Sequence, residues 1–467
     1  MAKLHQTKTP PIQKQVLQAQ ASPSASESAE YMSNPWDFLD ESRKDAEEIS
    51  RKSLTYAQDC WFRLRRNKTS MLALCVIALM VLSAIFIPLF WGYSYEDQNL
   101  NFANIPPKLD IYQLDEDTYV YITKEYKAVL VSEKGDLLEM AQLVNDDKTN
   151  RIYRYEVGGK PLVIDYSIYF NARKEMQQLE ALERKGKDIL AGQVRFLQKY
   201  EHSWEKDDVV SAHELELIME NKLTRFEVSY DSQVITAHKT VSNHTYIWGS
   251  DSLGRDIFIR VMYGARMSLL VGFMAALINF VIGVFYGGIA GYFGGRLDNV
   301  MMRVVDIVSS IPMMLYVILI MVVLGPGLQS IILAMSVTYW VDMARIVRAQ
   351  VLSLREQEFV MAAQLLGAST KRILIKHLIP NVMGPVMVSM SMQIPSAMFT
   401  EAFLSFIGLG VSAPQASWGT LCNDALMGLS SYPYQMFYPA LVMSITILAF
   451  NLFSDGLRDA LDPKLRK

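Results

Sequence analysis

The residues whose types and spacing indicate a specific interaction lie between Glu358 and Pro380. Ala362, Ala363 and Gly367 fall in one helix-forming stretch, and residues four apart share a helix face. Ala363 and Gly367 are therefore predicted to form a smooth surface that another backbone or side chain could approach closely. Such a surface binds a partner rather than carrying out a reaction. An ordinary amphipathic connector between two apolar segments is the alternative interpretation.

Residue types that usually carry catalysis are not found in catalytic spacing. The glycines of 158–160 and 408–410 lack the strand–loop–helix context of a phosphate-binding loop. Neither a Gly-x-Ser-x-Gly elbow nor a His-Glu-x-x-His motif occurs. Cys60, Cys75 and Cys422 are far apart, which fits neither a zinc site nor a disulfide framework. We therefore predict a chain without an active site, metal or cofactor of its own.

Long apolar stretches lie on both sides of the 358–380 segment. Hydrophobic residues make up 51% of the 467 residues and charged residues 20%, which predicts membrane spans together with a sizeable polar domain. The net charge of −3 offers no basic stripe for nucleic acid. One span is predicted at 69–92, and five more lie in 246–467, near 267–292, 307–325, 328–343, 382–409 and 436–453. The third is expected to break at Pro312.

Charge placement gives the orientation of these spans. Arginine and lysine precede the first span and recur in the predicted loop at 294–306, after the fourth span and at the C-terminus. The positive-inside rule then places both termini in the cytoplasm. Asp306 and Glu401 are predicted near span ends, so the middle of the membrane is almost free of charge. This disfavours an ion-coupled transporter, which usually keeps ionisable groups there.

Residues 93–245 differ in kind from the spans. Strands are predicted at 119–122, 128–131, 151–157 and 162–169, because β-branched and aromatic residues alternate with turn residues there. A charged helix is predicted at 172–200. These features indicate an α+β insertion that lies outside the cytoplasm. It caps the outer opening or holds a binding protein, or it only stabilises the neighbouring subunit.

Two segments precede the first span. Residues 1–34 are polar and rich in Gln, Ser and Pro, which predicts a disordered cytoplasmic N-terminus without a signal peptide. Residues 35–68 combine aromatic residues with a basic cluster, which predicts an amphipathic helix at the membrane surface. A helix that docks on a soluble partner is the alternative.

Two further motifs combine charges with glycine. The first motif predicts a tight, ion-paired turn before the second span, and its residues are Asp251, Gly254, Arg255 and Asp256. A turn with only a structural role fits the same pattern equally well. The second motif lies at the end of the last predicted span, and its charged residues are Asp455, Arg458 and Asp459.

Together these motifs resemble the C-type permease subunit of the dipeptide/oligopeptide (and nickel) ABC importers. The 358–380 segment is similar to the cytoplasmic coupling loop of these permeases, with Met361 where many members have glutamate and His377 where many have isoleucine. The long insertion departs from the family pattern. The resemblance implies an all-α membrane fold of about six helices of the ABC importer permease type, with the α+β insertion between helices one and two.

The resemblance also implies partners and site residues. The partners are a B-type permease, two ATPase subunits that bind ATP and magnesium, an extracytoplasmic peptide-binding protein and the lipid of the bacterial cytoplasmic membrane. The resemblance implies that Pro380 ends the coupling helix at 358–380. The remaining residues implied for ATPase coupling are Glu358, Met361, Ala362, Ala363, Gly367, Lys371, Arg372 and His377. Nickel or another small solute is the alternative cargo, and an ion-coupled secondary transporter is the less favoured alternative function.

Overall fold

The computed structural model describes residues 56–186, 190–200 and 225–461. The chain divides into two units, Met1–Asp59 and Cys60–Lys467, and only 56–59 of the first unit belong to the described residues. The predicted disordered segment 1–34, most of the predicted helix 35–68 and the tail 462–467 therefore lie outside the described part of the chain.

The first span is capped by an asparagine. Helix α2, Tyr56–Arg66, stops at Asn67, whose side chain accepts hydrogen bonds from the backbone of Thr69 and Ser70. This arrangement satisfies two of the free N–H groups at the start of α3, Lys68–Phe90. The predicted first span at 69–92 is thus found almost where the apolar run placed it.

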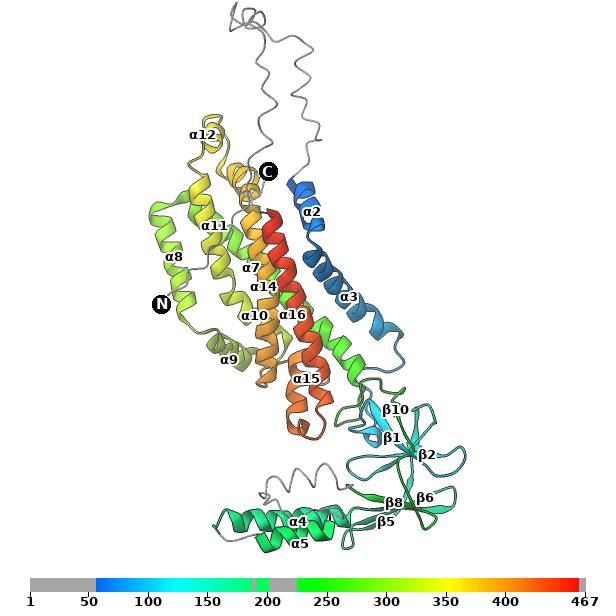
Figure 1. The fold of residues 1–467 in the computed structure, drawn as a ribbon. Helices are drawn as coiled ribbons and strands as arrows, with labels where there is room; N and C mark the ends of the chain where they lie inside the picture. Colours follow the sequence, from blue (N-terminus) through cyan, green and yellow to red (C-terminus); the bar gives the residue numbers. More distant parts are fainter. Residues whose placement is uncertain (1–55, 187–189, 201–224, 462–467) are drawn as a thin grey trace, which may run out of the picture. The chain divides into compact units, whose positions relative to one another are not determined.

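In the described ranges, five helical segments are long and apolar enough to cross a membrane, or six if one bent pair counts as a span. After α3 they are α7 (Ile257–Phe293), α10–α11 (Leu328–Thr338 and Trp340–Leu354), the continuous segment Thr370–Phe406, which ends in α14 (Ile379–Phe406), and α16 (Tyr434–Leu461). The bent pair is α8 (Gly295–Ser310) and α9 (Met313–Leu324), which turns by 80° at the predicted break (Figure 1). Two short helical elements, α15 (Trp418–Ala425) and η5 (Leu426–Gly428), precede α16.

Several predictions in this region were wrong. The fourth and sixth spans, predicted to end near 343 and 453, continue to Leu354 and Leu461. The second span begins at Ile257 rather than near Met267, because Asp256 caps the helix by accepting a hydrogen bond from the Phe258 amide. The predicted loop at 294–306 is instead helix α8. Its charged residues mark one face of an amphipathic helix, and a reversal of the chain at Gly294, with φ of 63°, separates it from α7.

Helices α7 and α11 pack with their backbones close together. Gly283, Gly287 and Gly291 lie four residues apart on α7 and face α11. A Cβ atom added at Gly287 would lie 2.3 Å from the carbonyl oxygen of Ala344. This contact therefore requires glycine, as in other close helix crossings within membranes.

The first span is held to α7 at a proline. Pro88 has no N–H, so the carbonyl of Ala84, four residues earlier, loses its helical partner. Arg266 of α7 donates from Nε to that carbonyl and from Nη2 to the carbonyl of Ile85 at 2.7 Å. Arg266 therefore supplies the hydrogen bond to Ala84 that the proline removes, and adds a second one to Ile85.

In its described residues, the insertion contains two five-stranded antiparallel sheets and a helical pair. The first sheet has the order β10-β1-β2-β3-β4 and the second β5-β6-β7-β8-β9. The strands are β1 (Lys108–Gln113), β2 (Tyr119–Ile122), β3 (Ala128–Val131), β4 (Leu137–Met140), β5 (Gln142–Asp147), β6 (Ile152–Val157), β7 (Lys160–Asp165), β8 (Glu227–Tyr230), β9 (Gln233–Ile235) and β10 (Lys239–Ser242). The single predicted helix at 172–200 is two helices, α4 (Ser167–Glu183) and α5 (Leu190–Tyr200).

The two sheets share one apolar core. Val120 and Ile122 of β2 are buried against Leu162 and Ile164 of β7. The first sheet is also attached to the helical part of the chain, because Asn104 and Ile105, at the short helix η3 (Leu100–Phe102), bond to Gln435 and Ser250. The predicted α+β insertion is therefore present and is attached at the N-terminal ends of α7 and α16.

If Arg266 compensates for Pro88, the two residues should be energetically coupled. Arg266→Ala is expected to destabilise the protein by about 1–2 kcal/mol, because two carbonyls lose their donor. In a Pro88→Ala background the same change should cost less, since the helix then satisfies Ala84 itself. A double-mutant cycle on thermal unfolding of the detergent-purified protein measures the coupling. Arg303→Ala, at an exposed arginine on α8, is the control, and strictly additive effects would contradict the interpretation.

Candidate functional site

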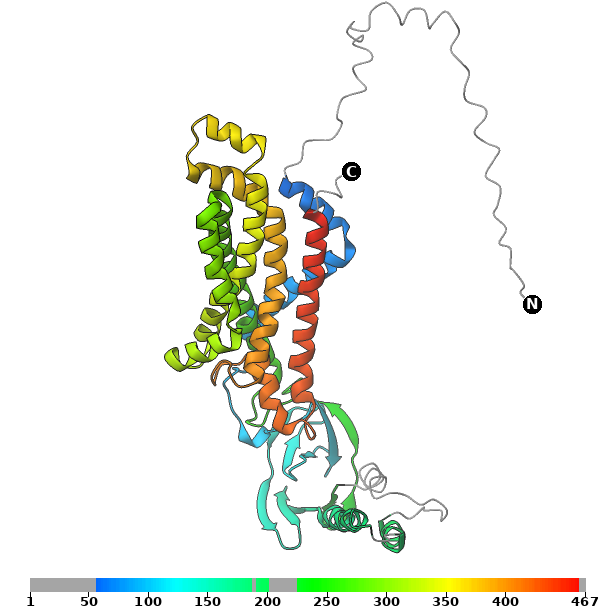
Figure 2. The same ribbon diagram turned by 90° about the vertical axis from the view of Figure 1, so that its left-hand side faces the viewer.

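The 358–380 segment leaves the bundle as a short helix and returns through a turn. Helix α12 is Glu358–Leu365, and it is followed by a turn of α-helix, α13 (Thr370–Arg372), and a π-helical turn, η4 (Ile373–Leu378). In Figure 2 this excursion, coloured yellow to light orange, lies at the end of the helix bundle. It connects α11 to α14.

Gly367 ends α12 rather than lying on its face. Its N–H bonds to the Gln364 carbonyl at 2.9 Å and the next N–H, of Ala368, bonds to the Ala363 carbonyl at 3.0 Å. With φ of 78° at Gly367, this is a Schellman motif, in which glycine adopts the left-handed conformation that closes a helix. The predicted shared face of Ala363 and Gly367 is therefore wrong, because the helix stops between them.

The two alanines also point in different directions. Ala363 is buried, together with Val360, in a cluster that includes Val351 of α11 and Val382 of α14, whereas Ala362 is exposed. The opposite side of the segment carries apolar residues that its own chain leaves uncovered. Leu365 and Leu366 are 89% and 88% exposed, and Phe359 and Met361 are also exposed. Sequence reasoning missed the two leucines, although a leucine pair directly before a helix-ending glycine could have indicated them.

The other predicted coupling residues are distributed around this segment. Glu358 opens α12 and is exposed, as is Arg372, while His377 is half-buried in η4. Lys371 lines a groove beside α7. Pro380 does not end the segment as predicted. It lies where η4 passes into α14, and the helical segment Thr370–Phe406 continues through it.

Beside the segment, an ion pair joins α8 to α11. Arg348 donates from Nε and Nη2 to the two carboxylate oxygens of Asp298, at 2.5 and 2.6 Å. A two-pronged pair of this kind fixes orientation as well as distance. The end of the bundle that carries α12 is therefore held in a defined arrangement.

A second charged cluster lies at the opposite end of α7. The carboxylate of Asp251 accepts from Arg255 Nε at 2.7 Å and from Arg260 Nη1 at 2.6 Å. Gly254 has φ of 71°, and a Cβ atom there would overlap the Asn99 carbonyl. The tight turn of the motif thus contains buried ion pairs and contacts the start of the insertion.

Asp256 completes this cluster, and among the described residues it has no cationic partner within 4.0 Å. Its carboxylate accepts from Trp91 Nε1 and from the Phe258 amide, both at 2.8 Å. Burial raises the pKa of the Asp256 carboxyl from 3.8 to about 6, against the opposing effect of these hydrogen bonds. The motif at the other terminus is different, since Asp455, Arg458 and Asp459 are exposed on α16 and Gly456 between them packs on Ser70 of α3.

Comparison with known proteins identifies the family. Residues 283–467 match the family described as binding-protein-dependent transport system inner membrane component, and residues 55–107 match the N-terminal TM domain of oligopeptide transport permease C. Neither match covers 108–282, which contains most of the insertion.

Individual relatives agree with these matches. The oligopeptide transport system permease protein OppC of Bacillus subtilis is 52% identical over 244 residues, which are 52% of this chain and 79% of that protein. The dipeptide transport system permease protein DppC of the same organism is 52% identical over 236 residues, 50% of this chain and 74% of that protein. A solved chain of the MetNI methionine ABC transporter overlaps with a TM-score of 0.36 at 20% identity, covering 44% of this chain and 98% of that one.

The apolar helices and these relatives define a multi-pass permease of the bacterial inner membrane. The chain belongs to the C-type permease subunits of the oligopeptide and dipeptide ABC importers. Membership implies that it works with an ATPase and with a second permease, and that it is a component of a transport system.

The raised pKa of Asp256 predicts a pH dependence of stability. Between about pH 4 and pH 6 the folded protein holds a proton on this carboxyl that the unfolded chain releases, so stability should fall as pH rises through this window. The expected loss is about 3 kcal/mol, since each pKa unit corresponds to about 1.4 kcal/mol. Asp256→Asn should flatten this part of the profile in thermal unfolding measurements. A variant that keeps the wild-type slope would show that Asp256 is not its source.

Proposed function

We propose that the chain forms half of a translocation pathway for peptides and that the 358–380 segment couples this pathway to a cytoplasmic ATPase. The exposed leucine pair at the tip of α12 carries the proposal. Leu365 and Leu366 expose most of their side chains, although the helix that bears them is fixed to the bundle by buried residues on its other side. An apolar tip on a rigid base is suited to insertion into a partner surface.

The connection to the spans supports transmission of movement. Because η4 continues into α14, and because Val360 and Ala363 pack against α11 and α14, displacement of the tip would tilt these helices as a body. ATP and magnesium are then bound by two partner ATPase subunits and not by this chain. The second half of the pathway comes from a B-type permease.

Peptide is the proposed cargo because the relatives with the highest identity quoted above are named as oligopeptide and dipeptide permeases. An extracytoplasmic peptide-binding protein would deliver it. Nickel or another small solute remains the alternative cargo, since the pathway is shared with another chain. The insertion, attached to the ends of α7 and α16 that lie away from α12, would then face the side from which the cargo arrives.

The coupling proposal is tested by removing the apolar tip. Leu365→Ser combined with Leu366→Ser is expected to lower peptide-stimulated ATP hydrolysis in proteoliposomes at least tenfold, because binding energy of the ATPase is lost while the buried face of α12 is unchanged. Met427→Ser, at another exposed apolar residue, is the control. Co-purification of the second permease should be unaffected. Full activity of the double variant would overturn the coupling role.

The orientation is tested by thiol labelling. With Cys60, Cys75 and Cys422 replaced, a cysteine at Lys148 in the insertion should react with a membrane-impermeant maleimide in intact spheroplasts. A cysteine at Leu366 should react only after the membrane is opened. Both positions are exposed, so accessibility across the membrane decides the result. Labelling of Leu366 in intact spheroplasts would refute the cytoplasmic position of the segment.

A further inference from the structure

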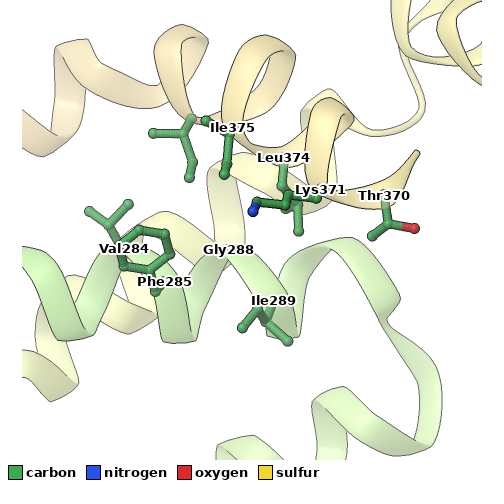
Figure 3. Close-up of a pocket in the computed structure, with 9 residues that line it drawn as sticks. Val284, Phe285, Gly288, Ile289, Thr370, Lys371, Leu374 and Ile375 are labelled. Atoms are coloured by element: carbon green, nitrogen blue, oxygen red, sulfur yellow. The ribbon is translucent and has the colours of Figure 1, made fainter. Parts of the chain in front are cut away.

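A groove of about 390 Å³ lies between α7 and the returning half of the coupling segment. One wall is the surface of α7 around Phe285, Gly288 and Ile289, and the other is formed by α13, η4 and the start of α14, with Lys371 and Ile375 among its residues. Figure 3 shows these walls facing each other, with the amino group of Lys371 between them. The surface of the groove is almost entirely apolar.

The position of the groove relates it to the membrane. Both walls belong to segments long and apolar enough to span a bilayer, and the groove lies at the end of these segments that carries α12. Phe285, Ile289 and Ile375 remain partly exposed, so the groove opens to the surface of the chain. An apolar groove open at this level would be accessible to a lipid acyl chain.

The charge beside the groove is positive and unpaired. Lys371, Arg372 and Lys376 are exposed, and in the part of the chain that the structure describes none of them has an ion-pair partner within 4.0 Å. Lys371 is the charged member of the described residues that line the groove. Its amino group can therefore reach an anion at the groove entrance while its methylene groups cover apolar surface.

We propose that this groove binds an anionic phospholipid of the leaflet next to the coupling segment. One acyl chain would lie between α7 and η4, and the phosphate of the headgroup would contact Lys371, with Arg372 and Lys376 adding to the attraction. This assigns Lys371 to lipid rather than to the ATPase. The site adjoins the π-helical turn through which α12 is joined to α14, so a bound lipid would brace that junction.

Two substitutions separate the headgroup from the acyl chain. Lys371→Gln removes the charge and leaves the groove open. Gly288→Leu fills the groove, and it should be tolerated because no atom lies within 4 Å of a Cβ atom at this position. Arg303→Gln, at an exposed arginine of α8, and Ile282→Phe, at an exposed position on α7, are the matched controls.

The measurement is native mass spectrometry of the chain purified with its transport partners after reconstitution in vesicles of phosphatidylglycerol and phosphatidylcholine. The wild type should retain phosphatidylglycerol in preference to phosphatidylcholine. Lys371→Gln should reduce this preference about fivefold, the size expected for one lysine at an anionic surface. Gly288→Leu should abolish retention of both lipids, and the controls should behave as the wild type.

Three results would overturn the proposal. In the first, the wild type shows no preference for phosphatidylglycerol. In the second, the Lys371→Gln variant keeps the full preference. In the third, the Gly288→Leu variant loses the second permease while the amount of phospholipid that it retains is unchanged. The last result would show that a partner chain covers the groove. Because lipid retention is measured without nucleotide, its outcome is independent of the coupling role proposed for Leu365 and Leu366.

Discussion

The structure depends on the burial of one side of the 358–378 excursion against the helix bundle. Val360 and Ala363 of α12 and Ile373 and Leu378 of η4 lie in a single cluster with residues of α7, α11 and α14. A short helix outside a membrane has little stability of its own, because nucleation is unfavourable and few hydrogen bonds follow. Packing against three long helices supplies the stability that helix propensity alone does not provide. It also keeps the exposed pair Leu365 and Leu366 in a fixed position.

The same constraint explains why glycine occurs where it does. Close packing of α7 on α11 brings the backbone of Gly287 against that of Ala344, and any side chain would separate the helices that support α12. Gly367 serves a different purpose, since no neighbour would contact its Cβ and only its backbone conformation requires glycine. Small residues in this chain therefore mark close packing in one place and a change of direction in the other.

Much of the fold could be predicted from local pattern. The strands at 119–122 and 128–131 were predicted at their observed bounds, because turn residues flank short β-branched and aromatic runs. The strand predicted to reach Tyr169 ends at Asp165, where the carboxylate accepts a hydrogen bond from the Ser167 amide and a helix begins. Periodicity alone could not show this change, which depends on one side-chain contact.

The predicted coupling residues illustrate the limit more sharply. Spacing placed Ala363 and Gly367 on one face because it assumed that the helix continues, yet the Schellman motif ends it, and Ser369 then caps the next turn. Glycine followed two residues later by a capping serine is a sequence signal for such a break. Which face remains uncovered, however, depends on how α12 folds back onto α11 and α14, and local spacing does not show this.

The two ends of α7 have opposite physical character, and this suggests how movement would be confined. At its first turn, Arg260 of the helix and the neighbouring Arg255 form buried ion pairs with Asp251 of the preceding turn, and breaking such pairs is expensive because it leaves a buried charge uncompensated. At its other end, α7 contacts α11 and η4 mostly through glycine and apolar side chains, apart from the hydrogen bond that Arg355 donates to the Tyr292 carbonyl. The ion pair of Asp298 with Arg348 there joins α8 to α11 and does not involve α7. A displacement applied at α12 would therefore be absorbed near its origin and along α14, while the ion-paired end stays in place. That asymmetry is what a permease requires if one side of the pathway is to open while the other is held closed.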